Sequence, residues 1–144
     1  MQDSAQISVY AVGSDQSGAT DLGANGTAQF YYRTRSALDA TIGPCNNVTA
    51  NTRANGVTDG SGLFTVSRTA AALVSTYQNG IFLANTTHAS TGSPDASIRY
   101  LQIQGLNGNL RRLAFGCYGA GLNATQAANL NTRVQTAVAA LTVL

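Results

Sequence analysis

Apolar and polar residues alternate with a period of two over the first four-fifths of the chain, which is typical of β-strands. In the first such run, Ile7, Val9 and Ala11 share one face of the predicted strand. A loop is predicted over 14–26, where two glycine-containing turn signals occur. The pattern predicts strands over 6–13, 27–35, 38–42, 47–52, 63–68, 73–78, 81–86, 97–104 and 111–119.

The strongest local prediction is a hairpin at Asn79-Gly80. This pair favours positive φ at both central positions of a type I′ turn. A two-residue loop would place Tyr77 opposite Phe82, and the aromatic pair would stabilise one face of the sheet. The register of this hairpin is therefore predicted from the sequence.

The hydrophobic period changes near the C-terminus, from Ala124 onward. Apolar residues then recur along one stripe of a helix, at Leu130, Val134, Val138 and Leu141. Asn123 immediately precedes this stripe and is a suitable N-cap. The pattern predicts one α-helix over about 124–142 that covers an edge or an open end of the strands.

Strands at intervals of roughly ten residues, with no helix between them, predict an all-β antiparallel sandwich. A chain of 144 residues is long enough for one such domain, over 1–144, and too short for two. We expect Leu101 and Ile103 in its core. We also expect Leu113, Phe115 and Cys117 to point inward together from the last strand.

Composition narrows the function classes. Only 10% of the residues are charged, with eight Arg, six Asp, no Lys and no Glu, and the formal net charge is +2. Scattered arginines of this number give no field that would gather nucleic acid. No apolar run is long enough to span a bilayer, and the first residues lack the pattern of a signal peptide. We therefore expect neither nucleic-acid binding nor membrane insertion.

Catalytic and metal-binding groups are sparse. His88 is the single histidine, and its position in a Ser/Thr/Gly loop favours a surface role over that of a general base. One histidine and two distant cysteines do not make a zinc site. Loop aspartates could ligate calcium, but they also form turns, which is the simpler reading; they are Asp15, Asp21, Asp59 and Asp95. We expect a protein without a cofactor or resident metal that is not an enzyme.

Two further features leave alternatives open. Cys45 and Cys117 either form one disulfide or are two unpaired small hydrophobic residues. Tyr31 alternates in phase with Arg33 and Arg35, which makes these three residues a candidate sugar-binding patch on a solvated face. An ordinary solvated sheet face or a subunit contact would explain the same pattern.

Several segments together resemble a known family. They are GLFTVSRT (62–69), YQNGIFLANTT (77–87), SPDASIRYLQ (93–102), RRLAFGCYGAGL (111–122) and the closing segment NATQAANLNTRVQTAV. In this order they resemble the concanavalin A-like lectin/laminin G type modules of bacteriophage virion proteins and some bacterial surface proteins. The resemblance implies a jelly-roll sandwich and a homo-oligomeric fibre or decoration domain at the virion surface, contacting other virion proteins and host-surface polysaccharide. The alternative is an extracellular or cell-surface carbohydrate-binding adhesin module of bacteria.

The chain departs from this family in two ways. The segment QDSAQISVY reads as an interior strand rather than an opening one. The chain would then lack an edge strand or form the C-terminal part of a larger polypeptide, and an open sheet edge would need a neighbour or a blunting device. Glycosidases of this fold use glutamates, and this chain has none, so hydrolysis of glycans is not expected.

Overall fold

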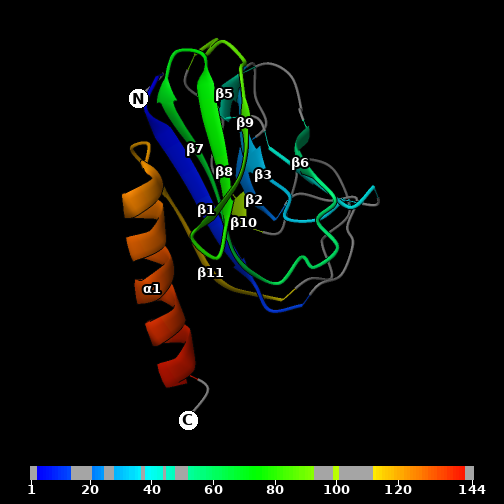
Figure 1. The fold of residues 1–144 in the computed structure, drawn as a ribbon, viewed down its shortest axis with the longest axis vertical. Coiled ribbons are helices and arrows are strands. Elements are labelled where there is room, and N and C mark those ends of the chain that lie inside the picture. The colour runs from blue at the N-terminus through cyan, green and yellow to red at the C-terminus, as the bar shows by residue number, and fades with distance from the viewer. Residues whose placement is uncertain are drawn as a thin grey trace.

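The structure, a computed structural model, describes residues 3–13, 21–24, 28–36, 38–43, 45–47, 52–92, 99–100 and 112–141 (Figure 1). Its elements are β1 (Ala5–Ala11), β2 (Leu22–Ala24), β3 (Gln29–Tyr32), β4 (Ala40–Ile42), β5 (Cys45–Asn47), β6 (Thr52–Asn55), β7 (Gly62–Ala70), β8 (Leu73–Gln78), β9 (Ile81–Thr86), β10 (Arg99–Tyr100), β11 (Leu113–Gly119) and α1 (Ala124–Leu141). The predicted class, an all-β antiparallel sandwich with one C-terminal helix, is confirmed.

The described strands form three antiparallel sheets. The five-stranded sheet has the order β11-β1-β7-β8-β9, the four-stranded sheet has the order β10-β2-β3-β5, and β4 pairs with β6. β1 lies between β11 and β7, so the prediction that the first strand is an interior one is confirmed. The ends of the five-stranded sheet are β11 and β9.

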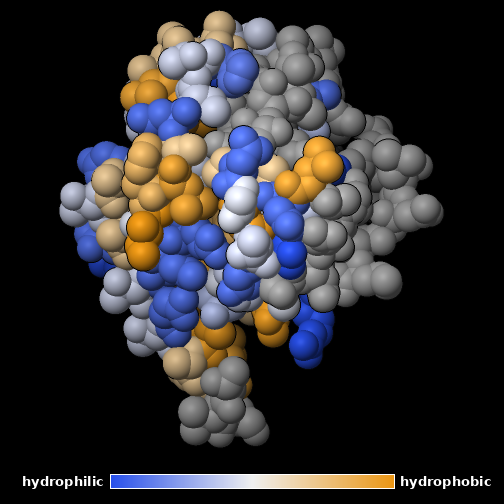
Figure 2. Space-filling view, turned by 45° about the vertical axis from the view of Figure 1, so that its right-hand side comes forward, coloured by the Kyte–Doolittle hydropathy of each residue, from blue (hydrophilic) through white to orange (hydrophobic). Residues whose placement is uncertain are grey.

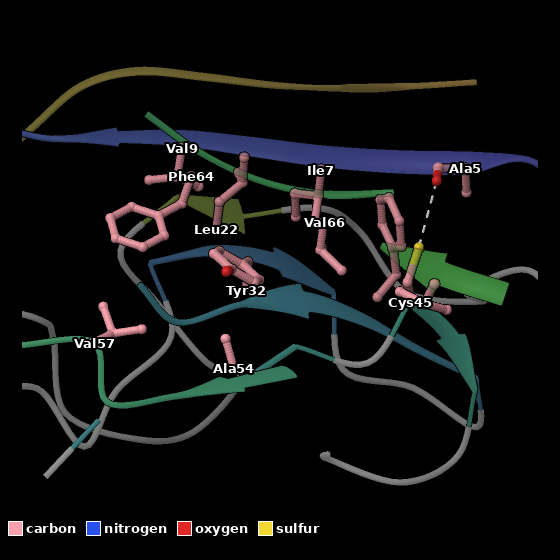
Figure 3. Close-up of a cluster of buried hydrophobic side chains, with 12 residues drawn as sticks. Ala5, Ile7, Val9, Leu22, Tyr32, Cys45, Ala54, Val57, Phe64 and Val66 are labelled. Carbon is pink, nitrogen blue, oxygen red and sulfur yellow. Dashed lines mark hydrogen bonds between the residues drawn. The ribbon is translucent and has the colours of Figure 1, made fainter. Parts of the chain in front are cut away.

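The hydrophobic core lies between the five-stranded and the four-stranded sheets (Figure 3). Tyr32 from the four-stranded sheet packs against Phe64 from β7, with ring centroids 6.3 Å apart. Full burial of each large apolar side chain contributes about 1.5–3 kcal/mol. The cluster comprises Ala5, Ile7, Val9, Leu22, Phe30, Tyr32, Cys45, Ala54, Val57, Phe64, Val66 and Val74.

The opposite face of the five-stranded sheet is also buried, but its side chains are mainly polar. Ser8 lies opposite Thr65 in the register, and their hydroxyl groups are 2.8 Å apart. Ser8 also donates to Oε1 of Gln6 at 2.7 Å. Helix α1 contacts β7 and β9 from this side, and Tyr10 lies 3.5 Å from Oε1 of Gln135. The inner strands of the five-stranded sheet are therefore covered on both faces, by apolar packing on one and by the helix on the other.

The turn between β11 and α1 is held tightly against β7. The hydroxyl of Ser67 lies 2.8 Å from the carbonyl oxygen of Leu122 and 2.6 Å from its amide nitrogen. Gly121 lies so close to the backbone of Arg68 that an added Cβ would overlap that carbonyl oxygen. Glycine is required here because only a residue without a side chain permits this approach.

The N-terminus of α1 confirms the predicted cap. Asn123 Oδ1 accepts a hydrogen bond from the amide of Gln126 at 3.0 Å, and Gln126 Oε1 accepts one from the amide of Asn123 at 2.9 Å. This reciprocal pair satisfies two of the free donors at the helix start. Val134 is buried as predicted, whereas Leu141 at the end of the stripe is 65% exposed, because the C-terminal end of α1 projects past the sheet (Figure 1).

The hairpin between β8 and β9 also follows the prediction. Asn79 and Gly80 both have positive φ, at 52° and 77°, as a type I′ turn requires. Tyr77 pairs with Phe82, and their rings meet edge to face with centroids 6.0 Å apart. The aromatic pair therefore fixes the register at the turn end of the hairpin.

One predicted segment is wrong in detail. The predicted loop over 14–26 contains β2, in which Gly23 passes so close to Tyr31 that no side chain would fit. Its glycine marks a close backbone approach rather than a turn. Of the strand predicted over 47–52, Asn47 ends β5 and Thr52 begins β6, and 48–51 lie outside the described residues. Leu101 and Ile103 lie outside the described residues.

The inward side of β11 also differs from the expectation. The pairing with β1 shifts between Tyr10 and Ala11, so that Tyr10 lies opposite Phe115 but Ala11 lies opposite Leu113. This bulge sends Leu113 toward the core between the sheets, while Phe115 lies on the helix side. Simple alternation predicts Leu113 and Phe115 on the same face of the strand. The extra residue of the bulge places them on opposite faces.

Both cysteines are free thiols. Cys45 lies in the core and contacts the carbonyl oxygen of Ala5 at 3.5 Å. Cys117 lies on the helix side of the central sheet, 3.5 Å from Nε2 of Gln6. The two thiols are therefore on opposite faces of the five-stranded sheet and form no disulfide.

We predict that Gly121→Ala destabilises the fold, because the new methyl group would overlap the backbone of Arg68. Overpacking of this kind costs about 1–3 kcal/mol. The matched control is Gly119→Ala, where the nearest atom would lie 3.8 Å away. Urea unfolding measures both variants, and equal stabilities would contradict the close approach described here.

Candidate functional site

The candidate patch predicted on β3 is largely covered. Tyr31 is only 7% exposed, so the expectation of a solvated aromatic side chain is wrong. Arg33 and Arg35, which follow on the same side of the alternation, are half-buried. The structure thus leaves the two arginines, rather than Tyr31, accessible at this position.

Arg35 has two carboxylates near it. Its Nε and Nη2 atoms both lie 2.8 Å from Oδ1 of Asp39. The side chain of Asp39 is more exposed than that of Arg35. Asp39 adopts φ of 50°, and its carbonyl oxygen accepts a hydrogen bond from Val57. Asp59 has a pKa below its usual value, because Ser61 donates hydrogen bonds to it and, to a smaller extent, because Arg35 is near. We call Arg35, Asp39 and Asp59 the charged cluster.

Two of the aspartates considered as calcium ligands lie within the described residues, and each accepts a hydrogen bond from a backbone amide. Asp59 accepts a hydrogen bond from the amide of Ser61 at 2.9 Å, which is the local turn expected from the sequence. Asp21 is fully buried and accepts a hydrogen bond from the amide of Thr34 at 2.7 Å. Asp15 and Asp95 lie outside the described residues. Within the described ranges, no three His, Cys or acidic residues gather as a metal site would require.

A cleft of about 450 Å³ lies between the C-terminal half of α1 and the adjacent end of the five-stranded sheet. Val12, Val138 and Leu141 supply apolar walls, and Tyr10 and Gln135 supply polar groups. The cleft exists because α1 extends past the sheet (Figure 1). The sequence did not indicate it, because it depends on where the helix lies.

A run of exposed apolar residues lies on β9. Ile81 is 71% exposed, Phe82 is 53% exposed and Leu83 is 36% exposed. On the face drawn in Figure 2, hydrophobic and hydrophilic groups are interspersed. Three consecutive exposed apolar residues are unusual on a strand, and such features mark interaction surfaces.

Arg68 is the largest fully buried side chain in the described structure. Its Nε donates to the carbonyl oxygen of Cys45 at 2.7 Å. Its Nη1 donates to the carbonyl oxygens of Ala71 at 2.6 Å and of His88 at 2.8 Å, with a longer contact to Ala70. One guanidinium therefore ties β5, the turn between β7 and β8, and the segment after β9 together.

The charge of Arg68 is neutralised only partly. Burial lowers the pKa of Arg68 from its usual value, and the nearby Cys45 sulfur and the carboxylate of Asp3 act in the opposite direction. Backbone carbonyl oxygens, rather than an ion pair among the described residues, solvate the guanidinium. This arrangement is structural, and it assigns to His88 a backbone role beside the core.

Comparison with known proteins gives no family assignment. No model of a known protein family matches the chain, and no curated protein sequence matches it significantly. The resemblance to concanavalin A-like modules therefore stays a prediction. In the part of the chain that the structure describes, no helix is both long enough and apolar enough to cross a membrane.

Two of these features were missed by the sequence reasoning, and the sequence held a signal for each. Asp39 follows Arg35 by four residues, a spacing at which opposite charges can pair. Arg68 lies inside a strand that is otherwise apolar or hydroxyl-bearing, where an arginine indicates a buried, hydrogen-bonded role. Neither signal identifies the partner atoms, which come from distant segments.

We predict that Arg68→Met destabilises the protein by about 3 kcal/mol, because it leaves one buried and two partly buried carbonyl oxygens without donors. Arg68→Lys keeps the charge but cannot reach the same acceptors, so it gives a smaller loss. The control is Arg133→Met on the exposed face of α1, which stays within about 0.5 kcal/mol. Thermal and urea unfolding measure the stability of the three variants. An unchanged stability in Arg68→Met would contradict the structural role of Arg68.

Proposed function

We propose that this protein is a non-enzymatic surface component of a bacteriophage virion, a fibre or decoration domain that forms homo-oligomers and recognises host-surface glycans. The proposal rests on the resemblance carried by the segments named above. The observation that supports it best is that two of these segments are consecutive in the chain and pack on the same sheet. RRLAFGCYGAGL supplies β11 and the turn whose Gly121 packs on β7, and the closing segment supplies α1.

The fold is compatible with a structural component of a larger assembly. The inner strands β1, β7 and β8 of the five-stranded sheet are buried on both faces, so little backbone or side-chain movement is available at its centre. The polar residues under α1 are hydrogen-bonded to one another through Gln6, Ser8 and Thr65 rather than grouped around a cavity. A closely packed centre of this kind is compatible with a module that carries contacts in an assembly.

The charged cluster is the position that we propose for glycan contact. Arg35 offers N–H donors, and the partly exposed carboxylate of Asp39 offers acceptors. A sugar hydroxyl both donates and accepts, so neighbouring hydroxyls on one ring can bind such a pair together. This refines the predicted patch by keeping Arg35 and replacing the buried Tyr31 with Asp39.

The alternative is a carbohydrate-binding adhesin module on a bacterial surface or in the surrounding medium. The same cluster would then be the main functional site, and assembly into a particle would play no part. The two proposals differ in where the protein occurs and in whether a monomer suffices for binding.

Mass spectrometry of purified phage particles tests the first proposal. We expect the chain among the particle proteins, and antibody labelling in electron micrographs should place it on the outside. Recovery of the chain only from bacterial surfaces or culture medium, never from particles, would support the adhesin alternative instead.

A glycan array probed with the purified protein tests the binding site. We expect Asp39→Asn to reduce binding at least about tenfold, because a lost charged hydrogen bond is worth about 1.5–3 kcal/mol. Asparagine tolerates the positive φ of this position, so the backbone is retained. Arg35→Gln should act similarly, and Arg133→Gln on the helix is the control. Binding that is the same in all three variants would place the glycan elsewhere.

A further inference from the structure

Asparagine is chemically least stable where glycine follows it in the chain. The backbone nitrogen of the glycine can attack the side-chain carbonyl carbon of the asparagine, because glycine has no side chain to obstruct the approach. Two Asn-Gly pairs lie within the described residues, and their surroundings differ. The chain contains four such pairs in all, at Asn25-Gly26, Asn55-Gly56, Asn79-Gly80 and Asn107-Gly108.

Asn79 is held in place in the hairpin between β8 and β9. Its Oδ1 accepts a hydrogen bond from the amide of Leu63 at 2.9 Å, and its own amide donates to the carbonyl oxygen of Leu63 at 2.7 Å. A Cβ on Gly80 would lie 3.0 Å from Cα of Ala128, so the turn packs closely against α1. The side chain of Asn79 and the backbone that follows it are therefore both restrained.

Asn55 lies in the opposite kind of environment. It is the last residue of β6, and both Asn55 and Gly56 are exposed. In the part of the chain that the structure describes, the side chain of Asn55 makes no hydrogen bond. Gly56 has φ of 72°, and a Cβ built on it would meet no atom within 4 Å. Opening the end of a short strand costs little free energy, so Asn55 can bring its side chain to the nitrogen of Gly56.

We propose that Asn55 is a site of spontaneous deamidation. The backbone nitrogen of Gly56 loses its proton to solvent and attacks Cγ of Asn55, and the new N–Cγ bond closes a succinimide ring. The Cγ–Nδ2 bond breaks, and Nδ2 leaves as ammonia after taking a proton from water. Water then opens the ring. Addition at Cγ gives aspartate, whereas addition at the main-chain carbonyl carbon gives isoaspartate, in which the chain continues through the side chain.

The position of Asn55 gives this modification a structural consequence. Isoaspartate adds a methylene group to the backbone directly before Gly56. Val57 follows, and it is buried in the core while its amide donates to the carbonyl oxygen of Asp39 at 2.8 Å. The longer backbone shifts Val57 from this position and disturbs the pairing of Asn55 with Ala40. Both products also place a new negative charge in the strand pair that begins directly after Asp39.

Peptide mass mapping of the full chain, aged in mildly alkaline buffer, tests this inference. Cleavage after arginine gives the peptide 54–68, in which Asn55 is the only asparagine. In the folded protein, Asn55 should lose its amide at least about tenfold faster than Asn79, since a small difference in the free energy of local opening gives a factor of this size. Labelling by an isoaspartyl methyltransferase should appear in the same peptide.

The control variant is Asn55→Gln, because glutamine closes the corresponding ring far more slowly. It should abolish the mass gain in 54–68. It also separates Asn55 from Asp59, which precedes Gly60 in the same peptide and isomerises without a change of mass. Relative to fresh samples, aged wild type should unfold at a lower urea concentration, and aged Asn55→Gln should lose less stability. Equal losses would contradict the effect on Val57.

A second reference is the chain unfolded in guanidinium chloride, where Asn55 and Asn79 should react at similar rates because the fold no longer restrains either. Two results would overturn the inference. One is an Asn55 that keeps its amide in the folded protein but loses it when unfolded, and the other is an Asn79 that reacts as fast as Asn55 in the folded protein. Neither result bears on the proposed function, which the particle analysis and the glycan array test separately.

Discussion

The burial of the inner strands β1, β7 and β8 on both faces of the five-stranded sheet is the constraint on which the rest of the structure depends. Ile7, Val9 and Phe64 point into the apolar core shared with the four-stranded sheet. The alternate residues, such as Ser8 and Thr65, lie on the side covered by α1 and satisfy one another by hydrogen bonds. Because neither face has room to change, the turn at Gly121 and the buried guanidinium of Arg68 must fit the sheet closely.

Because the inner strands of this sheet are covered on both faces, a partner can contact the molecule only at the ends of the sheet, at the loops or at α1. This explains why the exposed features collect where they do: the apolar residues on the end strand β9, the charged cluster on the segments after β3 and β6, and the cleft where α1 extends past the sheet. Low charge lets such a surface approach a neutral partner without a large desolvation cost. These exposed features are the places at which a partner could contact the molecule.

The sequence predicted the features that depend on local rules. The Asn79-Gly80 turn, the Asn123 cap, the helix bounds and the class of fold follow from turn chemistry and periodicity. It failed where long-range packing overrides the local pattern. Gly23 was read as a turn because its close approach to Tyr31 is invisible along the chain, and the bulge opposite Tyr10 reverses the expected side of Phe115. The same limit applies to the candidate site. The alternation with Arg33 and Arg35 predicted a solvated Tyr31, but Tyr31 is buried in the folded chain.

The central claim is that β1 and β7 are buried on both faces of the five-stranded sheet, whereas β9 and β11 at its two ends are more exposed. Hydrogen–deuterium exchange followed peptide by peptide tests it most directly. We predict that the amides of β1 and β7 exchange slowest and that those of β9 and β11 exchange faster. Equal exchange in all four strands, or slower exchange in β9 than in β1 and β7, would contradict the account.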